Sequence, residues 1–431
     1  MLPNIRDYSQ SVAYLERAER TIPLGSQTFS KSRTQFPVGA SPLFCKSGLG
    51  PSITDIDGNN YIDFACSLGS VTHGYADEDI NEAIEKQLKS GILFSMPHTI
   101  EAEVAERIVA MLPGAEKVRF GKNGSDATAG CIRLARAYTG RERVAVCGYH
   151  GWQDWYIGTT SRDLGVPKST KELTSTFPYN DLEAVRTLLE SYPGEFAAII
   201  LEPVAFTEPK PGYLEGLKAL AHKHSALLVF DEVVTGFRLR EGSAQQRYGV
   251  IPDLTALGKG LANGMPLSAV AGRADVMKLM EEIFFSFTMG GEALSLAAAS
   301  SVLDKVANEG SLETIDRSGR RLLEGVKQRL ESSGLEKYVS CIGLPCWSLF
   351  TFAHAPAATS FELKTLFIQE AALRGVFNIG LHFLGTKHDF DVIDEALAVY
   401  EEVFAILAEA AESGINGKLN CEPLVPLFKV R

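Results

Sequence analysis

Lys259 has the surroundings best suited to covalent chemistry in this sequence. It lies between Gly258 and Gly260, directly after the apolar run Leu254–Leu257, which predicts a buried strand. A lysine at such a position loses water, and desolvation lowers the pKa of its amine. The neutral amine then adds to carbonyl groups and forms an imine. Lys259 is therefore a candidate nucleophile, although most lysines in proteins simply face solvent.

Two acidic residues also follow apolar runs. Asp231 comes after Ala226–Phe230, and Glu202 comes after Ala197–Leu201. A carboxylate at the buried end of a strand is costly unless it meets a cation or a strong hydrogen-bond donor. The residues alone leave two interpretations open for Asp231, a structural ion pair or a contact to a bound ligand. For Glu202, a solvated acid in a loop is the corresponding alternative.

Gly124 and Ser125 belong to a glycine-rich turn between the apolar run Val118–Phe120 and a predicted helix. Free amides and the positive end of a helix dipole bind phosphate, so this turn is a candidate phosphate site. A turn that merely caps the helix with Ser125 or Asp126 is the alternative. The spacing matches neither the P-loop nor the dinucleotide fingerprint, which argues against a nucleotide-binding oxidoreductase.

Tyr149 and His150 follow the apolar run Val144–Cys147 and place an aromatic face and an imidazole at another strand end. A flat ligand stacks on such a ring, whereas a packed aromatic turn is the alternative. A phosphate loop, a stacking ring, a strand-end aspartate and a desolvated lysine are together what a pyridoxal phosphate site requires. The combination predicts pyridoxal 5'-phosphate as the cofactor.

These residues need a scaffold that brings strand ends together. From about Asp77 to about Leu303, short apolar runs alternate with amphipathic stretches, which is typical of a mainly parallel sheet between helices. Ligands bind beyond the carboxyl ends of such strands. One helix is expected over Ser125–Tyr138. The expected strands are Val118–Phe120, Val144–Cys147, Ala197–Leu201, Ala226–Phe230, Leu254–Leu257 and Leu267–Ala271.

The two ends of the chain are expected to form a smaller α+β domain. Near the start, Asp57-Gly58 predicts a turn between two short strands. After Gly310 the pattern predicts further helices and strands, namely Leu312–Leu330, Tyr338–Ile342, Trp347–Phe352, Phe361–Arg374 and Val392–Glu412. The predicted domains are residues 1–76, which join the small domain, 77–309, the large cofactor-binding domain, and 310–431, the C-terminal small domain.

Composition excludes several classes of protein. The 431 residues are 45% hydrophobic and 22% charged, which is a globular mixture, and the net charge of −11 argues against nucleic-acid binding. The first twenty residues lack the apolar core of a signal peptide and no apolar run is long enough to span a membrane, so a cytoplasmic location is expected. Its seven scattered cysteines lack the spacing of a zinc site, so we expect reduced thiols and no metal.

Several motifs of this chain match those of a known family, namely Ile22-Pro23, Asp55–Asp63, Ile132–Gly140, Tyr149–Trp152, Leu201–Val204, Phe230–Arg238 and Leu257–Gly260. Through these motifs the sequence resembles the class III aminotransferases of fold type I along nearly its whole length, and within them the glutamate-1-semialdehyde 2,1-aminomutases. The resemblance implies an α/β fold, with a mainly parallel seven-stranded sheet between helices and a smaller α+β domain formed by both chain ends.

The resemblance implies roles for four residues around the cofactor ring. Lys259 would hold the cofactor as a Schiff base and move the proton between substrate Cα and cofactor C4′. Asp231 would keep the pyridine nitrogen protonated, which makes the ring an electron sink. Tyr149 would stack on one face of the ring, and Val233 would pack against the other.

The same resemblance implies further cofactor contacts. Gly124 and Ser125 would hold the phosphate, Glu202 would lie near the phenolic edge of the ring, and His150 would be a neighbour. Thr288 would bind the phosphate in the neighbouring subunit. A homodimer would then be obligatory for activity.

Departures from the aminomutase pattern fall on the substrate side. Lys31 replaces an arginine that binds the substrate carboxylate, unless a shift of two residues places Arg33 there. Leu68 replaces a tryptophan over the substrate, and Thr207 replaces an asparagine. His382 lies beside the position of a glutamate. These four residues, Lys31, Leu68, Thr207 and His382, are the predicted substrate-binding set.

The sequence therefore predicts an aminotransferase that moves an amino group from a small-molecule donor, glutamate or another amino acid, to a keto or aldehyde acceptor. A sugar-like acceptor is one candidate, because the substrate-side replacements change the polarity of the pocket. The alternative is the aminomutase reaction, which transfers the amino group within glutamate-1-semialdehyde and gives 5-aminolevulinate. A non-catalytic binding protein is a rival from another class, and the retained Lys259, Asp231 and Tyr149 argue against it.

Overall fold

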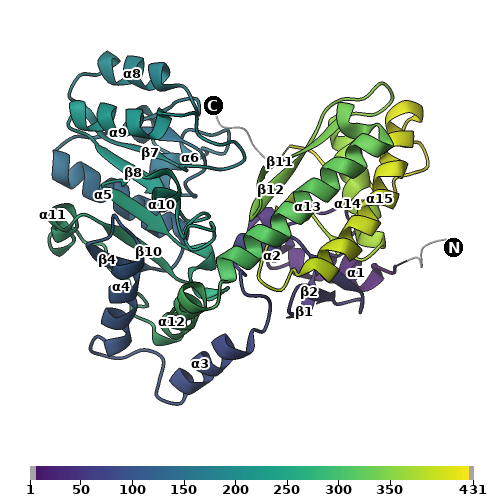
Figure 1. Ribbon diagram of the computed structural model, residues 1–431, viewed down its shortest axis with the longest axis horizontal. Helices are drawn as coiled ribbons and strands as arrows, with labels where there is room; N and C mark the ends of the chain where they lie inside the picture. Colours follow the sequence, from purple (N-terminus) through teal and green to yellow (C-terminus); the bar gives the residue numbers. More distant parts are fainter. Residues whose placement is uncertain (1–5, 427–431) are drawn as a thin grey trace. The chain divides into compact units, whose positions relative to one another are not determined.

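The computed structural model describes residues 6–426 of the chain, which divide into two compact units (Figure 1). Unit 1 contains both ends of the described chain, residues 6–77 and 313–426, and unit 2 contains residues 78–312. We keep the sequence-based domains, 1–76, 77–309 and 310–431, as a proposal beside this division. No helix within residues 6–426 is long and apolar enough to cross a membrane.

Unit 2 is built on a seven-stranded sheet in the order β4-β10-β9-β8-β7-β5-β6. Only β10 runs antiparallel to its neighbours, which confirms the predicted mainly parallel sheet and the α/β fold class. Each of the six predicted strands agrees with the structure within one residue at either end. The strands are β4 (Lys117–Gly121), β5 (Arg143–Cys147), β6 (Thr174–Thr176), β7 (Phe196–Leu201), β8 (Leu227–Asp231), β9 (Leu254–Leu257) and β10 (Ser268–Gly272).

Helices pack on this sheet because its central strands are apolar on both faces. Every residue of β7, β8 and β9 is buried, as expected of strands covered on both sides. In Figure 1, α8 and α9 lie together beside β7 and β8. The helices are α3 (Glu78–Leu88), α4 (Thr99–Met111), α5 (Gly124–Thr139), α6 (Asp154–Ile157), α7 (Lys168–Glu172), α8 (Leu182–Ser191), α9 (Tyr213–Lys223), α10 (Ala244–Tyr248), α11 (Ala274–Met277) and α12 (Ala293–Asn308).

Helix α5 shows why the sequence begins and ends a helix where it does. Asn123 caps its start, and the Asp126 side chain accepts hydrogen bonds back from the amides of Lys122 and Asn123, at 3.0 and 2.9 Å. Gly140 ends the helix with a φ of 66°, a left-handed conformation that favours glycine. The predicted helix, Ser125–Tyr138, is confirmed within one residue at each end.

Unit 1 contains two small sheets, β1-β2-β3-β13 and β11-β12-β14, with α14 and α15 packed together. The predicted Asp57-Gly58 turn is present between β2 and β3, and Gly58 has a φ of 90°. The elements are α1 (Ser9–Glu19), β1 (Cys45–Leu49), β2 (Ser52–Asp55), β3 (Asn60–Asp63), α2 (Cys66–Gly69), α13 (Ser311–Ser333), β11 (Val339–Leu344), β12 (Trp347–Phe352), α14 (Ser360–Leu373), β13 (Val376–Phe377), β14 (Leu381–Phe383) and α15 (Phe390–Ser413).

Candidate active site

Four neighbouring parallel strands, β9, β8, β7 and β5, end at the same edge of the unit 2 sheet. Lys259 lies just past the end of β9, Asp231 ends β8, Glu202 follows β7, and Tyr149 follows β5. Strand order therefore places these four side chains in a row, as the sequence predicted. A row of groups at the carboxyl ends of parallel strands is the usual ligand site of such sheets.

Lys259 occupies a constrained position at this edge. Its φ is 43°, in the left-handed region that few residues other than glycine adopt, and such backbone strain concentrates at functional sites. Burial lowers the pKa of its amine to about 8, against the opposing influence of the Glu202 and Asp231 charges. Roughly a tenth of the amine is therefore neutral at pH 7.

Asp231 is held in one orientation by two partners. His150 Nδ1 lies 2.8 Å from its Oδ2, and the Val233 amide donates to its Oδ1 at 3.1 Å. The other ring nitrogen of His150 lies 3.0 Å from the Cys147 carbonyl oxygen. Both ring nitrogens thus lie within hydrogen-bond distance of an oxygen, which fixes the orientation of the ring. His150 is a positioning residue for Asp231.

The turn before α5 has the close approaches expected of a phosphate cradle. A Cβ at Gly124 would lie 2.8 Å from Val233 Cγ1, and one at Gly151 would lie 2.2 Å from Ser125 Oγ. Ser125 Oγ also accepts from the Trp152 amide at 3.3 Å. The first amides of a helix have no intrahelical acceptor, so those of Gly124 and Ser125 face outward at the positive end of α5. These residues fit a bound phosphate.

Tyr149 presents an aromatic ring beside this edge. Its side chain is 53% exposed, its ring packs edge-on against Tyr156 with centroids 5.6 Å apart, and its amide donates to Glu202 at 3.1 Å. Burial and the nearby Asp231 charge raise the pKa of Glu202. Gly148 allows this approach, since a Cβ there would lie 2.6 Å from Glu202 Oε2. The sequence analysis assigned no role to Gly148, the glycine directly after β5, or to Tyr156.

Comparison with known proteins identifies the family. Residues 35–379 match the family model Aminotransferase class-III. The chain belongs to this family. The aminotransferase is 35% identical over 422 residues to a glutamate-1-semialdehyde 2,1-aminomutase of Syntrophobacter fumaroxidans, covering 91% of this chain and 97% of that protein. It is also 35% identical over 428 residues to the enzyme of that name from Roseiflexus castenholzii, covering 90% and 98%.

Solved structures of transaminases have the same fold as this chain. The FumI protein of Sphingopyxis sp. MTA144, described in its pyridoxal phosphate internal aldimine form, superimposes with a TM-score of 0.88 at 28% identity, covering 96% of this chain and 99% of that one. An omega-transaminase from Sphaerobacter thermophilus superimposes with a TM-score of 0.83 at 26% identity, covering 94% of this chain and 99% of that one. The protein is thus a class III aminotransferase of fold type I that uses pyridoxal 5'-phosphate, which supplies an electron sink when bound.

Two predicted residues of unit 2 lie on exposed segments of the aminotransferase. Thr207 is exposed in the segment between β7 and α9. Thr288 is exposed between the apolar side chains of Phe287 and Met289. The placement of both as ligand-binding residues stays a prediction.

Lys31 and Leu68 line one cavity of unit 1. The alternative residue Arg33 instead forms an ion pair with Glu19 at 2.5 Å, so the structure favours Lys31 as the cation of this region. His382 is different, because it is fully buried and its two ring nitrogens lie 3.0 Å from Ser348 Oγ and 2.9 Å from Tyr400 Oη. Burial lowers its pKa to about 3. We therefore withdraw His382 from the substrate-binding set and assign it to the core.

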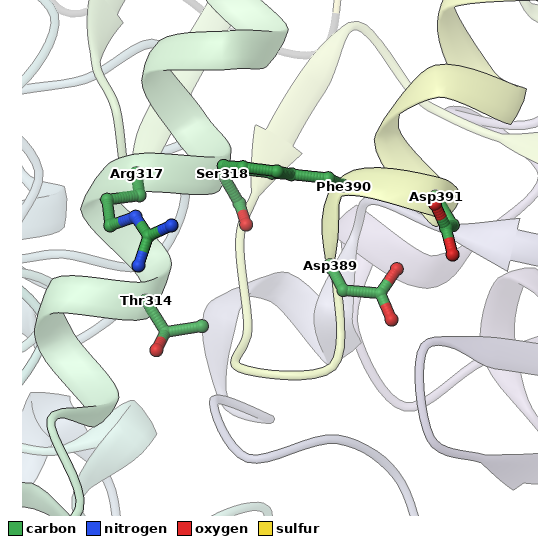
Figure 2. Close-up of a pocket in the computed structure, with 6 residues that line it drawn as sticks. All are labelled: Thr314, Arg317, Ser318, Asp389, Phe390 and Asp391. Atoms are coloured by element: carbon green, nitrogen blue, oxygen red, sulfur yellow. The ribbon is translucent and has the colours of Figure 1, made fainter.

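A second hollow of the aminotransferase, of about 320 Å³, lies in unit 1 where α15 begins beside α13 (Figure 2). Its polar groups serve the fold: Asp389 caps α15 by accepting from the Val392 amide at 3.0 Å, and the Arg317 guanidinium lies 5.5 Å from the Phe390 ring centroid. Carboxylates and a guanidinium are mixed in this hollow, so no single ligand charge is selected. Within residues 6–426, no cluster of histidine, cysteine and acidic residues is arranged for a metal ion.

Proposed function

We propose that this aminotransferase transfers an amino group from an amino acid donor, such as glutamate, to a separate keto or aldehyde acceptor. The row formed by Lys259, Asp231, Glu202 and Tyr149 at one sheet edge carries the proposal, because it supplies every group that amino transfer needs. Lys259 Nζ holds the cofactor and moves the proton at substrate Cα. Asp231 faces the ring nitrogen. A sugar-like acceptor stays one candidate, and the cytoplasmic location stays a prediction from the sequence.

The aminomutase reaction is the second candidate, favoured by the names of the relatives at 35% identity. Titration of the purified holoenzyme with L-glutamate distinguishes the two candidate reactions. Loss of the visible absorbance of the cofactor, with release of 2-oxoglutarate, supports transfer between molecules. Conversion of glutamate-1-semialdehyde to 5-aminolevulinate at an ordinary enzymic rate, without response to glutamate, would replace this proposal by the aminomutase reaction.

The buried amine of Lys259 predicts a pH dependence. Because burial lowers its pKa to about 8, the neutral fraction rises about tenfold between pH 7 and pH 9 and then levels. Reductive methylation of the cofactor-free protein, followed by mass spectrometry of the Lys259 peptide, measures this fraction. The exposed Lys223 serves as an internal control for a lysine that faces solvent. A Lys259 profile that matches Lys223 would contradict a desolvated amine.

We further propose that the enzyme is a homodimer in which Thr288 reaches the neighbouring phosphate site. Two exposed apolar segments support this proposal: one contains Phe94 and Met96, the other contains Phe284 and Met289. The Ala293 amide donates to the Ile92 carbonyl at 2.9 Å and joins the two segments. An apolar surface of this kind is typical of an interface between subunits.

Replacement of Met96 tests this interface. The side chain is 78% exposed, so Met96→Asp is expected to leave unit 2 folded but to shift the enzyme toward monomers and weaken cofactor binding. Analytical ultracentrifugation and cofactor titration measure the two effects. Leu164→Asp, at a fully exposed apolar residue outside these segments, is the matched control and should remain dimeric. A monomeric parent enzyme with full activity would contradict the proposal.

A further inference from the structure

Glu232 is a fully buried acid that lies between two residues of the proposed cofactor site. Asp231 precedes it and Val233 follows it, so its main chain joins the group placed at the ring nitrogen to the group placed at one ring face. The Glu232 amide donates to the Ala256 carbonyl on β9 at 2.9 Å, and the Gly236 amide donates to the Glu232 carbonyl at 2.9 Å. Any movement of Glu232 therefore moves both of its neighbours.

The Glu232 carboxylate is surrounded by hydrogen-bond donors. Its Oε2 accepts from the Ala244 amide at 2.6 Å and from the Thr235 hydroxyl at 3.1 Å. Its Oε1 accepts from the side-chain amide of Gln245 at 3.1 Å and from the backbone amide of the same residue at 3.4 Å. Three of these four donors are N–H groups, which cannot accept, so both oxygens must act as acceptors. Burial raises the pKa of Glu232, and these hydrogen bonds oppose that rise.

Gln245 continues this chain of hydrogen bonds and can take only one orientation. Its Oε1 accepts from the Gly114 amide at 2.8 Å, so its NH₂ group faces Glu232. The same NH₂ group donates to Thr255 Oγ1 at 3.2 Å, on β9. A Cβ at Gly114 would lie 2.8 Å from the Gln245 Oε1, so this close approach depends on glycine. The direction of each bond from Gly114 to Glu232 is therefore fixed.

The network joins β8 to β9, the strands that lead to Asp231 and Lys259. Glu232 directly follows β8 and Thr255 lies on β9, and the Gln245 NH₂ group is bonded to both. A buried hydrogen-bond network that is fully satisfied makes its surroundings rigid. Glu232 and Gln245 are themselves at most 1% exposed, so any effect on a bound ligand passes through their neighbours.

We propose that Glu232 and Gln245 are positioning residues that hold Asp231 and Val233 at the cofactor ring. This inference rests on the proposed amino transfer, in which Asp231 faces the ring nitrogen, and it adds two residues to that site. A carboxylate at residue 232 and an amide at residue 245 satisfy every bond of the network, whereas two amides or two carboxylates do not. A small displacement of Asp231 would misplace its contact to the ring, and such misplacement is costly for the rate.

Glu232→Gln breaks this order with almost no change in size. The remaining oxygen accepts from the Ala244 amide, so the new NH₂ group meets the NH₂ group of Gln245. Turning Gln245 round would place its NH₂ group against the Gly114 amide. We expect kcat of the holoenzyme to fall about 10- to 100-fold, with little change in the KM for donor. The visible absorbance maximum of the bound cofactor should also shift, because the contact at the ring nitrogen tunes the electronics of the ring.

Exchange of the two side chains tests whether the order of donors and acceptors is the cause. In Glu232→Gln/Gln245→Glu, the new amide donates to the new carboxylate, which also accepts from the Gly114 amide and the Thr255 hydroxyl. We expect this double variant to regain kcat to within about threefold of the parent, together with the parent absorbance, although each single variant is impaired. A double variant that is no better than Glu232→Gln would overturn the inference.

Two further variants keep the test independent of folding. Gln246→Glu is the matched control, because it makes the same change at the exposed neighbour of Gln245 in α10, and it should leave kcat and absorbance unchanged. Thr235→Val is a milder change that removes one bond to Glu232 and should lower kcat about two- to fivefold in a folded protein.

The outcomes also separate this inference from the proposed function. Lower thermal stability of Glu232→Gln, with the kcat and absorbance of the parent for each bound cofactor, would place Glu232 in the fold alone and contradict the inference. If Asp231→Asn also kept the kcat and absorbance of the parent, the proposed role of Asp231 would be refuted instead.

Discussion

Replacement of Lys259 by alanine is expected to lower amino transfer by at least about 10⁴-fold. In the proposed function, the amine both bonds to the cofactor aldehyde and acts as the base at substrate Cα, so no neighbouring group would replace both roles. The charges of Glu202, Arg238 and Asp231 act on the Lys259 amine, and none of these three side chains carries an amine that could take its place. Steady-state rates with the best donor measure the loss.

A second measurement keeps this prediction independent of turnover. Borohydride treatment should fix one cofactor per chain in the parent protein and none in Lys259→Ala, as measured by mass spectrometry. Lys223→Ala, at an exposed position that ends α9, is the control and should behave as the parent does. Retained function in Lys259→Ala would instead favour a non-catalytic binding protein.

The large unit could be predicted from the sequence because its strands are short apolar runs closed by glycine, proline or a charge. Such runs are buried on both faces, so burial alone fixes their limits, as in β9 (Leu254–Leu257). Strand β6 was not predicted, because Thr174–Thr176 has no apolar pattern and forms only by pairing beside β5. Pairing of this kind at the edge of a sheet cannot be predicted from the local sequence.

The row at the sheet edge was predictable for a related reason. In a parallel sheet, the residue after each apolar run lies at the ligand edge, so Asp231 and Lys259 follow from the strand limits alone. The partners of His382 were not predictable. Its burial depends on Ser348 and Tyr400, which lie on other elements of unit 1, so alignment alone placed it wrongly near substrate. The cavity around Lys31 is likewise assembled from distant stretches.

Asp231→Asn is expected to lower kcat by about 100-fold or more with little effect on the KM for donor. In the proposed function, Asp231 would bind the ring nitrogen of the cofactor; the change would weaken that bond, and a lost charge-assisted bond of up to about 3 kcal/mol corresponds to that factor. It also removes the carboxylate that lies 2.8 Å from His150 Nδ1 in the parent protein. Leaving a buried hydrogen-bonding group without its partner costs about 1–3 kcal/mol, so thermal stability should fall as well.

A double-mutant cycle separates the catalytic effect of Asp231 from the structural one. His150→Asn alone should lower kcat less than Asp231→Asn, because the carboxylate keeps its bond from the Val233 amide at 3.1 Å and still faces the ring. Adding His150→Asn to Asp231→Asn should restore much of the lost thermal stability, since the imidazole that lost its carboxylate partner is removed, but it should restore no kcat. Recovery of kcat in the double variant would mean that Asp231 acts through the fold. Absence of recovery would leave the contact between Asp231 and the ring nitrogen as the source of the rate.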